Sequence, residues 1–349
     1  MELTTVWFIL IAVLWIGYFV LEGFDFGVGV LLPFLARTQV ERRVMINTIG
    51  PVWDGNEVWV LVAGGATFAA FPEWYATLFS GFYLPLFLIL ISLIFRNVAF
   101  EYRGKRDDAR WRAWWDRAIF LGSLLPAVLW GVAFGNVVRG VEIGADKEYA
   151  GTLFDLLNPY ALLGGAVTLG LFVTHGAVFV SLKTTGDIRV RARSTAIATG
   201  LVTAVLALAF LGWTWALRDG AAHVGWFLVL AALAALCLVT GLVATRAGRE
   251  GWAFIATAAT IAAAVGGLFV ALFPDVMPSS VDEAYSLTTT NAASTHTTLV
   301  IMTWVAALFT PVVLAYQSWS YIVFRRRIGV QDIPHLGGDA HRPRAHAGP

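Results

Sequence analysis

The sequence predicts an all-α membrane protein with nine transmembrane helices. Of its 349 residues, 58% are hydrophobic and only 13% are charged, which is far from the composition of soluble globular proteins. The apolar residues gather in nine segments, each long enough to cross a bilayer core, which takes about 20 helical residues. These segments predict a lipid membrane as the partner of the chain. The formal net charge of +1 provides no positive field for nucleic acid, so we expect no nucleic acid partner.

The expected spans follow one another at short intervals, which indicates one helical domain over residues 1–328. The first span lacks the basic flank of a secretory signal and stays apolar for too long to be one, so we expect it to be retained. Residues 329–349, rich in Pro, Gly and His, are predicted to form a disordered cytoplasmic tail. The nine expected spans are 5–35, 52–72, 77–100, 117–138, 159–183, 196–217, 224–245, 252–273 and 296–324.

Proline positions agree with these boundaries. Pro51 and Pro159 fall at the first turns of the second and fifth spans, where a missing N–H group is tolerated. Pro85, Pro126 and Pro311 fall inside the third, fourth and ninth spans, where each is expected to kink its helix.

Basic residues alternate between the loops and predict the orientation of the chain. Lys and Arg accumulate on the cytoplasmic side of membrane proteins, and here they gather after the odd-numbered spans. The intervening loops hold only Arg139, Lys147 and Arg218. We therefore expect the N-terminus outside and the C-terminus inside. The basic residues after the odd-numbered spans are Arg37, Arg42, Arg43, Arg103, Lys105, Arg106, Arg110, Arg112, Lys183, Arg189, Arg191, Arg193, Arg246, Arg249, Arg325, Arg326 and Arg327.

Four acidic residues lie where the pattern predicts membrane. Glu22 and Asp25 belong to the first span, and Asp54 and Glu57 to the start of the second. Each pair is spaced i, i+3, so each pair shares one helical face. A charge near the bilayer centre costs at least about 2.5–3.5 kcal/mol, so such residues face protein or water and suggest a functional site.

Arg96 of the third span lies at about the depth of Asp54, near the cytoplasmic end. Two interpretations stay open. In the first, Arg96 and Asp54 form a buried ion pair that pins the helices together. In the second, the carboxylates form a hydrated relay that admits protons from the cytoplasm, which we favour for Asp25 because no basic residue is near it in the sequence.

Metal-ligating residues are sparse. His175 is the only histidine inside a predicted span, and a lone histidine there is usually a hydrogen-bonded packing residue. The single cysteine, Cys237, lies in an apolar run and has no partner for a disulfide. We expect no metal site in this chain, and if the protein takes part in redox chemistry, another subunit must hold the metals.

Several motifs together resemble subunit II of the cytochrome bd-type quinol oxidases. They are "LEGFDFGVGVLLPFL", "ERRVMINTIGPVWDGNEVWVLVAGGATFAAFPEWYA", "FSGFYLPLFLILISLIFRNVAFEYR", "FGNVVRGV", "LLNPYALLGG", "ALFPDVMPSS" and "MTWVAALFTPVVLAYQSWSYIVF". The resemblance extends over all nine spans and excludes only the tail.

The resemblance implies a respiratory complex in the prokaryotic cytoplasmic membrane. A similarly folded subunit I would hold haem b, haem d and the quinol-binding loop. The complex would oxidise quinol, reduce oxygen to water and generate a proton motive force without pumping. Subunit II would bind no haem, support assembly and hold a quinone in a structural role, and a small accessory subunit is compatible with the family.

The resemblance also assigns site residues. Asp25 and Asp54 match family acids proposed to line a proton route at the subunit interface. The residues around them that match the family cluster are Trp53, Asn56 and Trp59. The intramembrane charge pattern, rather than the resemblance, adds Glu57, Glu22 and Arg96 as support residues. Some relatives have Gln in place of Glu57 and Asp in place of Glu22, so we expect neither to be an obligatory proton carrier.

Two other functions are compatible with intramembrane acids. In a purely structural accessory subunit, every acid would serve packing. A secondary transporter would instead use midplane acids to bind a coupling ion and would show an internal repeat. We find no repeat in the sequence, which leaves the structural subunit as the more serious alternative.

Overall fold

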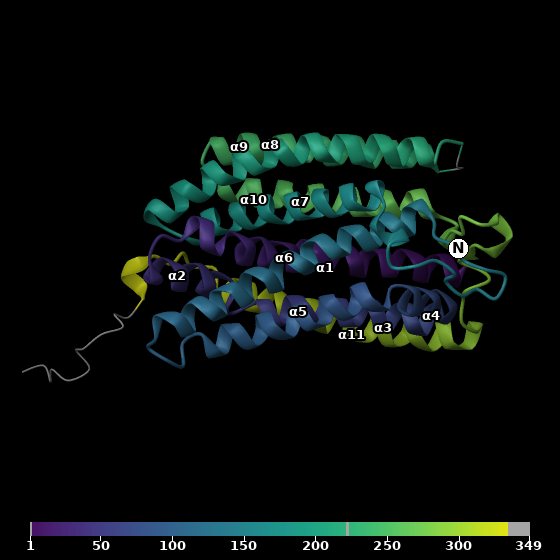
Figure 1. Ribbon diagram of the computed structural model, residues 1–349, viewed down its shortest axis with the longest axis horizontal. Helices are drawn as coiled ribbons and strands as arrows, with labels where there is room; N and C mark the ends of the chain where they lie inside the picture. Colours follow the sequence, from purple (N-terminus) through teal and green to yellow (C-terminus); the bar gives the residue numbers. More distant parts are fainter. Residues whose placement is uncertain (1, 221–222, 334–349) are drawn as a thin grey trace, which may run out of the picture.

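The computed structural model describes residues 2–220 and 223–333, which form a bundle of long helices lying side by side (Figure 1). Short strands and 3-10 helices occur only at the two ends of the bundle (Figure 1). The elements are α1 (Leu3–Leu35), α2 (Gln39–Ile49), α3 (Trp53–Ala70), α4 (Pro72–Gly81), α5 (Tyr83–Tyr102), α6 (Ala109–Arg139), η1 (Asp155–Leu157), α7 (Pro159–Lys183), α8 (Gly186–Leu217), α9 (Val224–Arg246), α10 (Glu250–Leu272), β1 (Asp275–Met277), η2 (Glu283–Tyr285), β2 (Leu287–Thr288), α11 (His296–Val323) and η3 (Val330–Asp332).

The predicted all-α membrane class is confirmed. Within the described residues, eight helices are long and apolar enough to cross a membrane. The ninth expected span, 52–72, forms α3, which has 18 residues. Asp54, Asn56 and Glu57 in its first turns lower the hydropathy of α3, which is not among the eight. The total of nine spans and the orientation therefore stay predictions.

Several boundaries differ from those expected. α6 begins at Ala109 rather than near residue 117, because the Asp108 side chain caps it by accepting hydrogen bonds from the backbone N–H groups of Arg110 and Trp111. α8 begins at Gly186 rather than near residue 196. In both cases basic residues expected in a loop lie on the helix end.

α2 was not expected as a helix. It begins after Thr38, whose hydroxyl accepts a hydrogen bond from the Glu41 backbone N–H group. Its buried residues include Val44, Met45 and Ile49, so the helix packs one apolar face against the bundle. We call the end of the bundle where α2 and η3 lie the basic end (Figure 1).

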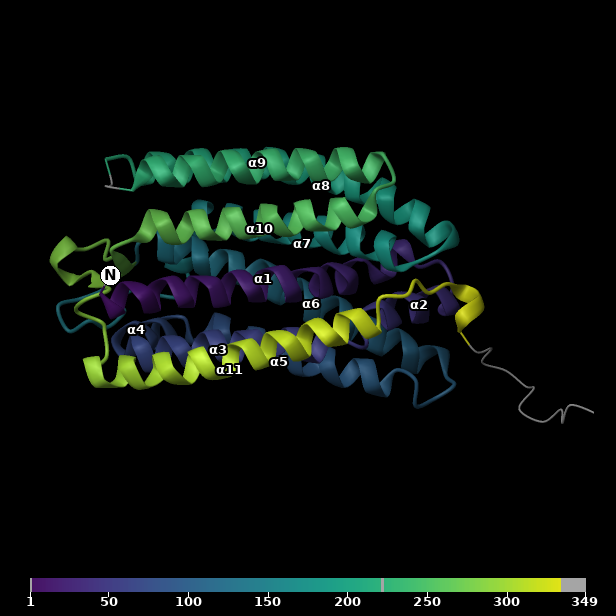
Figure 2. The same cartoon turned by 180° about the vertical axis from the view of Figure 1, so that it is seen from behind.

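α1 lies in the middle of the bundle, between an edge formed by α8 and α9 and an opposite edge formed by α3, α4, α5 and α11 (Figures 1 and 2). Its closest neighbour is α7. A Cβ atom on Gly27 would lie 2.0 Å from the Phe172 carbonyl oxygen, and one on Gly176 would lie 2.6 Å from Gly27. Glycine at both positions therefore allows the two backbones to touch.

α11 lies on the outside of the bundle (Figure 2). Leu299 is its only buried residue. At the end opposite the basic end, Trp7 Nε1 donates hydrogen bonds to the Leu299 carbonyl oxygen at 3.2 Å and to Thr303 Oγ1 at 3.1 Å. Polar contacts thus add to the apolar packing that attaches α11 to the rest of the chain, which involves Leu299, Met302, Ala306 and Tyr321.

The predicted tail 329–349 begins with ordered structure. Val330–Asp332 forms η3, and Ile333 is buried, with 7% of its surface exposed. The remaining tail residues, 334–349, lie outside the described residues, so their predicted disorder stays a prediction.

Candidate functional site

A cluster of charged side chains lies inside the bundle between α1, α3 and α5. Glu22 and Asp25 on α1 and Arg96 on α5 are all 0% exposed. The Arg96 guanidinium lies over the Phe26 ring at 4.8 Å and near the Phe100 ring at 5.7 Å. Such cation–π contacts stabilise a buried guanidinium but do not neutralise its charge.

Carboxylates neutralise that charge. Arg96 Nη2 forms ion pairs with Glu22 Oε1 and, at 3.4 Å, with Glu57 Oε2. The other Glu57 oxygen accepts a hydrogen bond from Asn97 Nδ2 at 2.8 Å. The Glu57 side chain is 18% exposed, so the cluster reaches the surface of the isolated chain at this point.

The pairing of Arg96 with Asp54, one of the two interpretations that the sequence left open, is not found among the ion pairs of Arg96. Asp54 is exposed, in the first turn of α3. Glu57 follows it by three residues, which places it about 4.5 Å further along the helix axis and about 60° around it. That rotation turns Glu57 toward Arg96. The sequence gives only the approximate depth of each residue in the membrane, which is similar for the two carboxylates and does not distinguish them.

Asp25 belongs to a second set of contacts. Its Oδ2 atom accepts a hydrogen bond from Asn56 Nδ2 at 2.7 Å. Asn56 Oδ1 accepts hydrogen bonds from the Tyr321 hydroxyl at 2.7 Å and from Gln317 Nε2 at 3.2 Å. Gln317 Oε1 in turn accepts a hydrogen bond from Trp59 Nε1 at 2.8 Å. A continuous polar chain therefore joins α1, α3 and α11.

Sequence reasoning missed Gln317 and Tyr321. Both lie on α11, more than 250 residues from Asn56, and both are common residue types near a membrane interface. The only available signal was their helical spacing of four residues within an apolar span, which places them on one face.

Several atoms of the site have no hydrogen-bond partner among the described residues. They are Glu22 Oε2, Asp25 Oδ1, Arg96 Nε and Arg96 Nη1, all of them buried. Buried donors and acceptors of this kind usually bind ordered water. The arrangement therefore presents two buried carboxyl groups with unpartnered oxygens, and a carboxyl group can both take up and release a proton.

The tryptophans of the predicted cluster support this site by packing. The Trp53 ring contacts the Phe100 ring, with centroids 5.3 Å apart. The Trp59 ring covers Gly17 so closely that a Cβ atom there would lie 2.2 Å from the ring. The two rings thus hold the start of α3 against α5 and α1.

His175 is a hydrogen-bonded packing residue, as predicted. Its Nδ1 atom lies 2.7 Å from Thr257 Oγ1, its Nε2 atom lies 3.2 Å from the Val20 carbonyl oxygen, and its ring stacks on Phe254. Because both nitrogens are engaged, His175 does not fit the role of a haem ligand. Over residues 2–220 and 223–333, no group of three or more His, Cys, Asp or Glu residues could hold a metal ion.

An apolar cavity of about 210 Å³ lies between α1 and helices α6 to α10. Its lining residues with polar side-chain groups are Thr168, Thr260 and Trp130. The two hydroxyls already donate hydrogen bonds to the backbone carbonyl oxygens of Gly164 and Ala256, and the Trp130 indole N–H group donates to the Tyr18 hydroxyl. The cavity therefore suits an apolar chain better than a polar ring.

Comparison with known proteins gives consistent matches. The family described as Cytochrome bd terminal oxidase subunit II matches residues 3–324. Cytochrome bd ubiquinol oxidase subunit 2 of Bacillus subtilis (strain 168) is 45% identical over 328 residues, covering 94% of this chain and 97% of the relative. Cytochrome bd-I ubiquinol oxidase subunit 2 of Escherichia coli (strain K12) is 42% identical over 363 residues, covering 94% and 96%.

The fold also matches a solved structure. A chain of the bd oxidase from Geobacillus thermodenitrificans has a TM-score of 0.76 with this one, covering 93% of this chain and 98% of that chain. The two sequences are 19% identical, so this likeness is evidence for the fold alone.

Proposed function

Because the chain belongs to the cytochrome bd terminal oxidase subunit II family, we propose that it helps to carry protons from the cytoplasm toward its partner subunit. As a family member it is a multi-pass membrane subunit of a prokaryotic respiratory oxidoreductase complex. The complex would couple quinol oxidation to the reduction of oxygen to water and generate a proton motive force without pumping. Haem b and haem d, held by subunit I, would supply the electron transfer and the oxygen chemistry.

The polar chain through Asp25 is the observation that carries this proposal. Asp25 is buried, one of its oxygens accepts a hydrogen bond from Asn56, and the other has no partner among the described residues. A carboxyl group can both take up and release a proton, whereas the Asn56 amide can only orient it. With the N-terminus outside, the site lies in the cytoplasmic half, so protons would enter from that side.

The face formed by α3, α5 and α11 is the proposed surface for subunit I. It carries large exposed apolar side chains, among them Leu61, Phe95 and Trp304. It also carries the exposed Asp54 and the partly exposed Glu57. A carboxylate that faces lipid costs at least about 2.5–3.5 kcal/mol, so protein or trapped water should cover these two. Asp54 would then connect the buried cluster to the partner.

The apolar cavity would hold only the tail of a quinone. The apolar cavity beside α7 and α8 suits an isoprenoid tail, because its lining is apolar and its two threonine hydroxyls already donate elsewhere. No free donor in the lining would hold the quinone carbonyl groups. We therefore propose that a structurally bound quinone places its tail, rather than its ring, in this cavity.

The ion pairs of Arg96 favour a second function, that of a purely structural accessory subunit. Arg96 joins α5 to Glu22 on α1 and to Glu57 on α3, so the charged cluster also pins three helices. A purely structural accessory subunit would need only these contacts. It would not need a carboxyl group at Asp25, which forms no ion pair in the described part of the chain.

The variant Asp25→Asn separates the two functions. The amide keeps the size of the carboxyl group but cannot cycle a proton, so we expect assembly and haem content to be retained while turnover falls at least about tenfold. The measurement is quinol-dependent oxygen uptake per haem d. Glu57→Gln is the matched control and should retain most activity. Unchanged turnover of a fully assembled Asp25→Asn complex would remove Asp25 from any obligatory proton path.

A further inference from the structure

The residues that follow α11 cross the basic end of the bundle. We call residues 324–333 the strap. Its Ile328 N–H group donates to the Lys183 carbonyl oxygen at 2.9 Å, and the Thr185 N–H group donates to the Ile328 carbonyl oxygen at 3.2 Å. Thr184 and Ile328 form a parallel β-bridge. The strap thus adds one short strand to the turn between α7 and α8.

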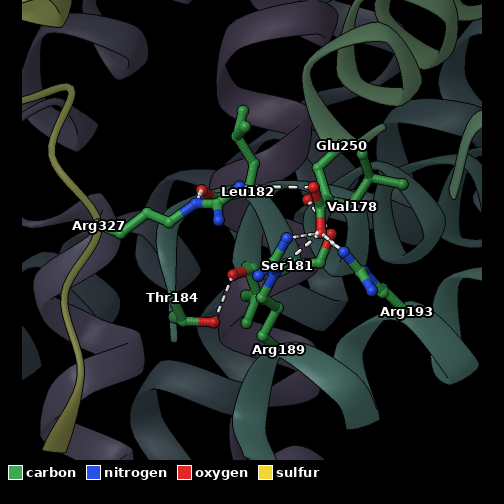
Figure 3. Close-up of polar contacts among 9 residues, drawn as sticks. Val178, Ser181, Leu182, Thr184, Arg189, Arg193, Glu250 and Arg327 are labelled. Carbon is green, nitrogen blue, oxygen red and sulfur yellow. Dashed lines mark hydrogen bonds and ion pairs between the residues drawn. The ribbon is translucent and has the colours of Figure 1, made fainter. Parts of the chain in front are cut away.

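One carboxylate joins the strap to α8 and α10 (Figure 3), and the buried Ile333 packs the end of the strap into the apolar cluster. Glu250, the first residue of α10, has a side chain that is only 3% exposed. Its Oε1 atom accepts hydrogen bonds from Arg189 Nε at 2.8 Å and from Arg193 Nε at 2.7 Å. Its Oε2 atom accepts from Arg327 Nη2 at 3.4 Å, and Arg327 Nε donates to the Leu182 carbonyl oxygen at 2.9 Å.

Glu250 offsets part of the positive charge of this group, which still keeps a net charge of +2. Three guanidinium groups, two from α8 and one from the strap, face one carboxylate. With that carboxylate removed, the three positive charges would repel one another at close range. Arg327 is the most exposed of the three, at 37%, so we expect it to move away first and to take the strap with it.

The strap is connected directly to the candidate site. Tyr321 lies three residues before the strap, and its hydroxyl donates a hydrogen bond to Asn56, the hydrogen-bond partner of Asp25. The helix that carries Tyr321 has only one buried residue. Tyr321 is partly buried against the apolar cluster at this end of the bundle, and the strap is its nearest further attachment along the chain.

We propose that Glu250 is a positioning residue for this site. By holding Arg327 it closes the strap, and the closed strap keeps Tyr321 and Gln317 on Asn56. The effect on turnover depends on the proton route proposed above, whereas the closure of the strap does not.

Strap closure can be measured by disulfide cross-linking in the assembled complex. A Cβ atom on Gly329 would lie 2.3 Å from Thr185 Oγ1, so Thr185→Cys and Gly329→Cys should form a disulfide readily in a Cys237→Ser chain. Adding Glu250→Gln should slow the oxidation about tenfold, because a charge-assisted hydrogen bond is lost. An unchanged rate would overturn the proposal. If Glu250→Gln does not assemble, Arg327→Gln should slow the oxidation in the same way.

Glu41→Gln is the matched control. Glu41 also accepts a hydrogen bond from an arginine of α8, Arg191, and its side chain is 13% exposed, but none of its hydrogen bonds or ion pairs involves the strap. We expect the cross-linking rate to stay unchanged in this variant. An equal slowing in Glu41→Gln would mean that any lost charge loosens this end of the bundle, which would also overturn the proposal.

Turnover then tests the positioning role. Glu250→Gln should lower kcat about threefold or more, with KM for quinol unchanged, and the closed disulfide should restore kcat. Failure of the disulfide to restore kcat would show that Glu250 does not act through the strap. The two proposals can fail separately. Full turnover in Asp25→Asn would contradict the proton route, but it would not change the cross-linking rates that test the closure of the strap.

Discussion

Removal of Arg96 should leave a buried carboxylate without a counter-charge. Arg96 and Glu22 both have 0% exposed side chains, so in Arg96→Gln no solvent reaches the unpaired Glu22. Breaking a pair of this kind costs about 3–5 kcal/mol. The lost cation–π contact with Phe26 at 4.8 Å adds about 0.5–2 kcal/mol. Since typical stabilities are about 5–15 kcal/mol, the amount of assembled complex should fall sharply.

Double variants test which carboxylate is the partner. In Glu22→Gln with Arg96→Gln, both charges are absent, so part of the lost stability should return. In Asp54→Asn with Arg96→Gln, Glu22 stays unpaired and no recovery is expected, because Asp54 is exposed and does not contact Arg96. The measurements are the yield of assembled complex per mass of membrane protein and the temperature of irreversible inactivation in detergent.

Two results would refute this reasoning. Equal rescue by Asp54→Asn and by Glu22→Gln would show that the ion-pair assignment is wrong. Normal yield and normal inactivation temperature in Arg96→Gln alone would show that the buried charge is compensated by something other than Arg96.

The remaining predictions concern topology and His175. In a Cys237→Ser chain in intact cells, a cysteine at position 283 should react with an impermeant reagent and a cysteine at position 108 should not, because Lys and Arg accumulate inside; the reverse pattern would invert the orientation. His175→Ala should keep every haem band in the absorption spectrum of the complex. It should also lower the inactivation temperature, since the lost hydrogen bonds are worth about 1–3 kcal/mol. Loss of one haem band would instead identify His175 as a ligand.

The sequence alone was sufficient to predict the fold class. A bilayer accepts only long apolar helices or closed barrels, so runs such as Leu3–Leu35 and Pro159–Lys183 could be identified without knowledge of their neighbours. α2 was missed because its apolar residues are too few to span a membrane. Its helix depends on a cap at Thr38 and on packing against the bundle, both of which require the rest of the fold.

The charged residues of the site could also be found in the sequence, because Glu22, Asp25 and Arg96 are conspicuous in apolar spans. Their partners could not. Whether Arg96 meets Asp54 or Glu57, and whether Tyr321 reaches Asn56, depends on the rotation of each helix about its axis and on its height relative to its neighbours. These two quantities are set by side-chain packing between helices, such as the contact of Trp59 with Gly17, and a one-dimensional pattern of hydrophobicity contains neither of them.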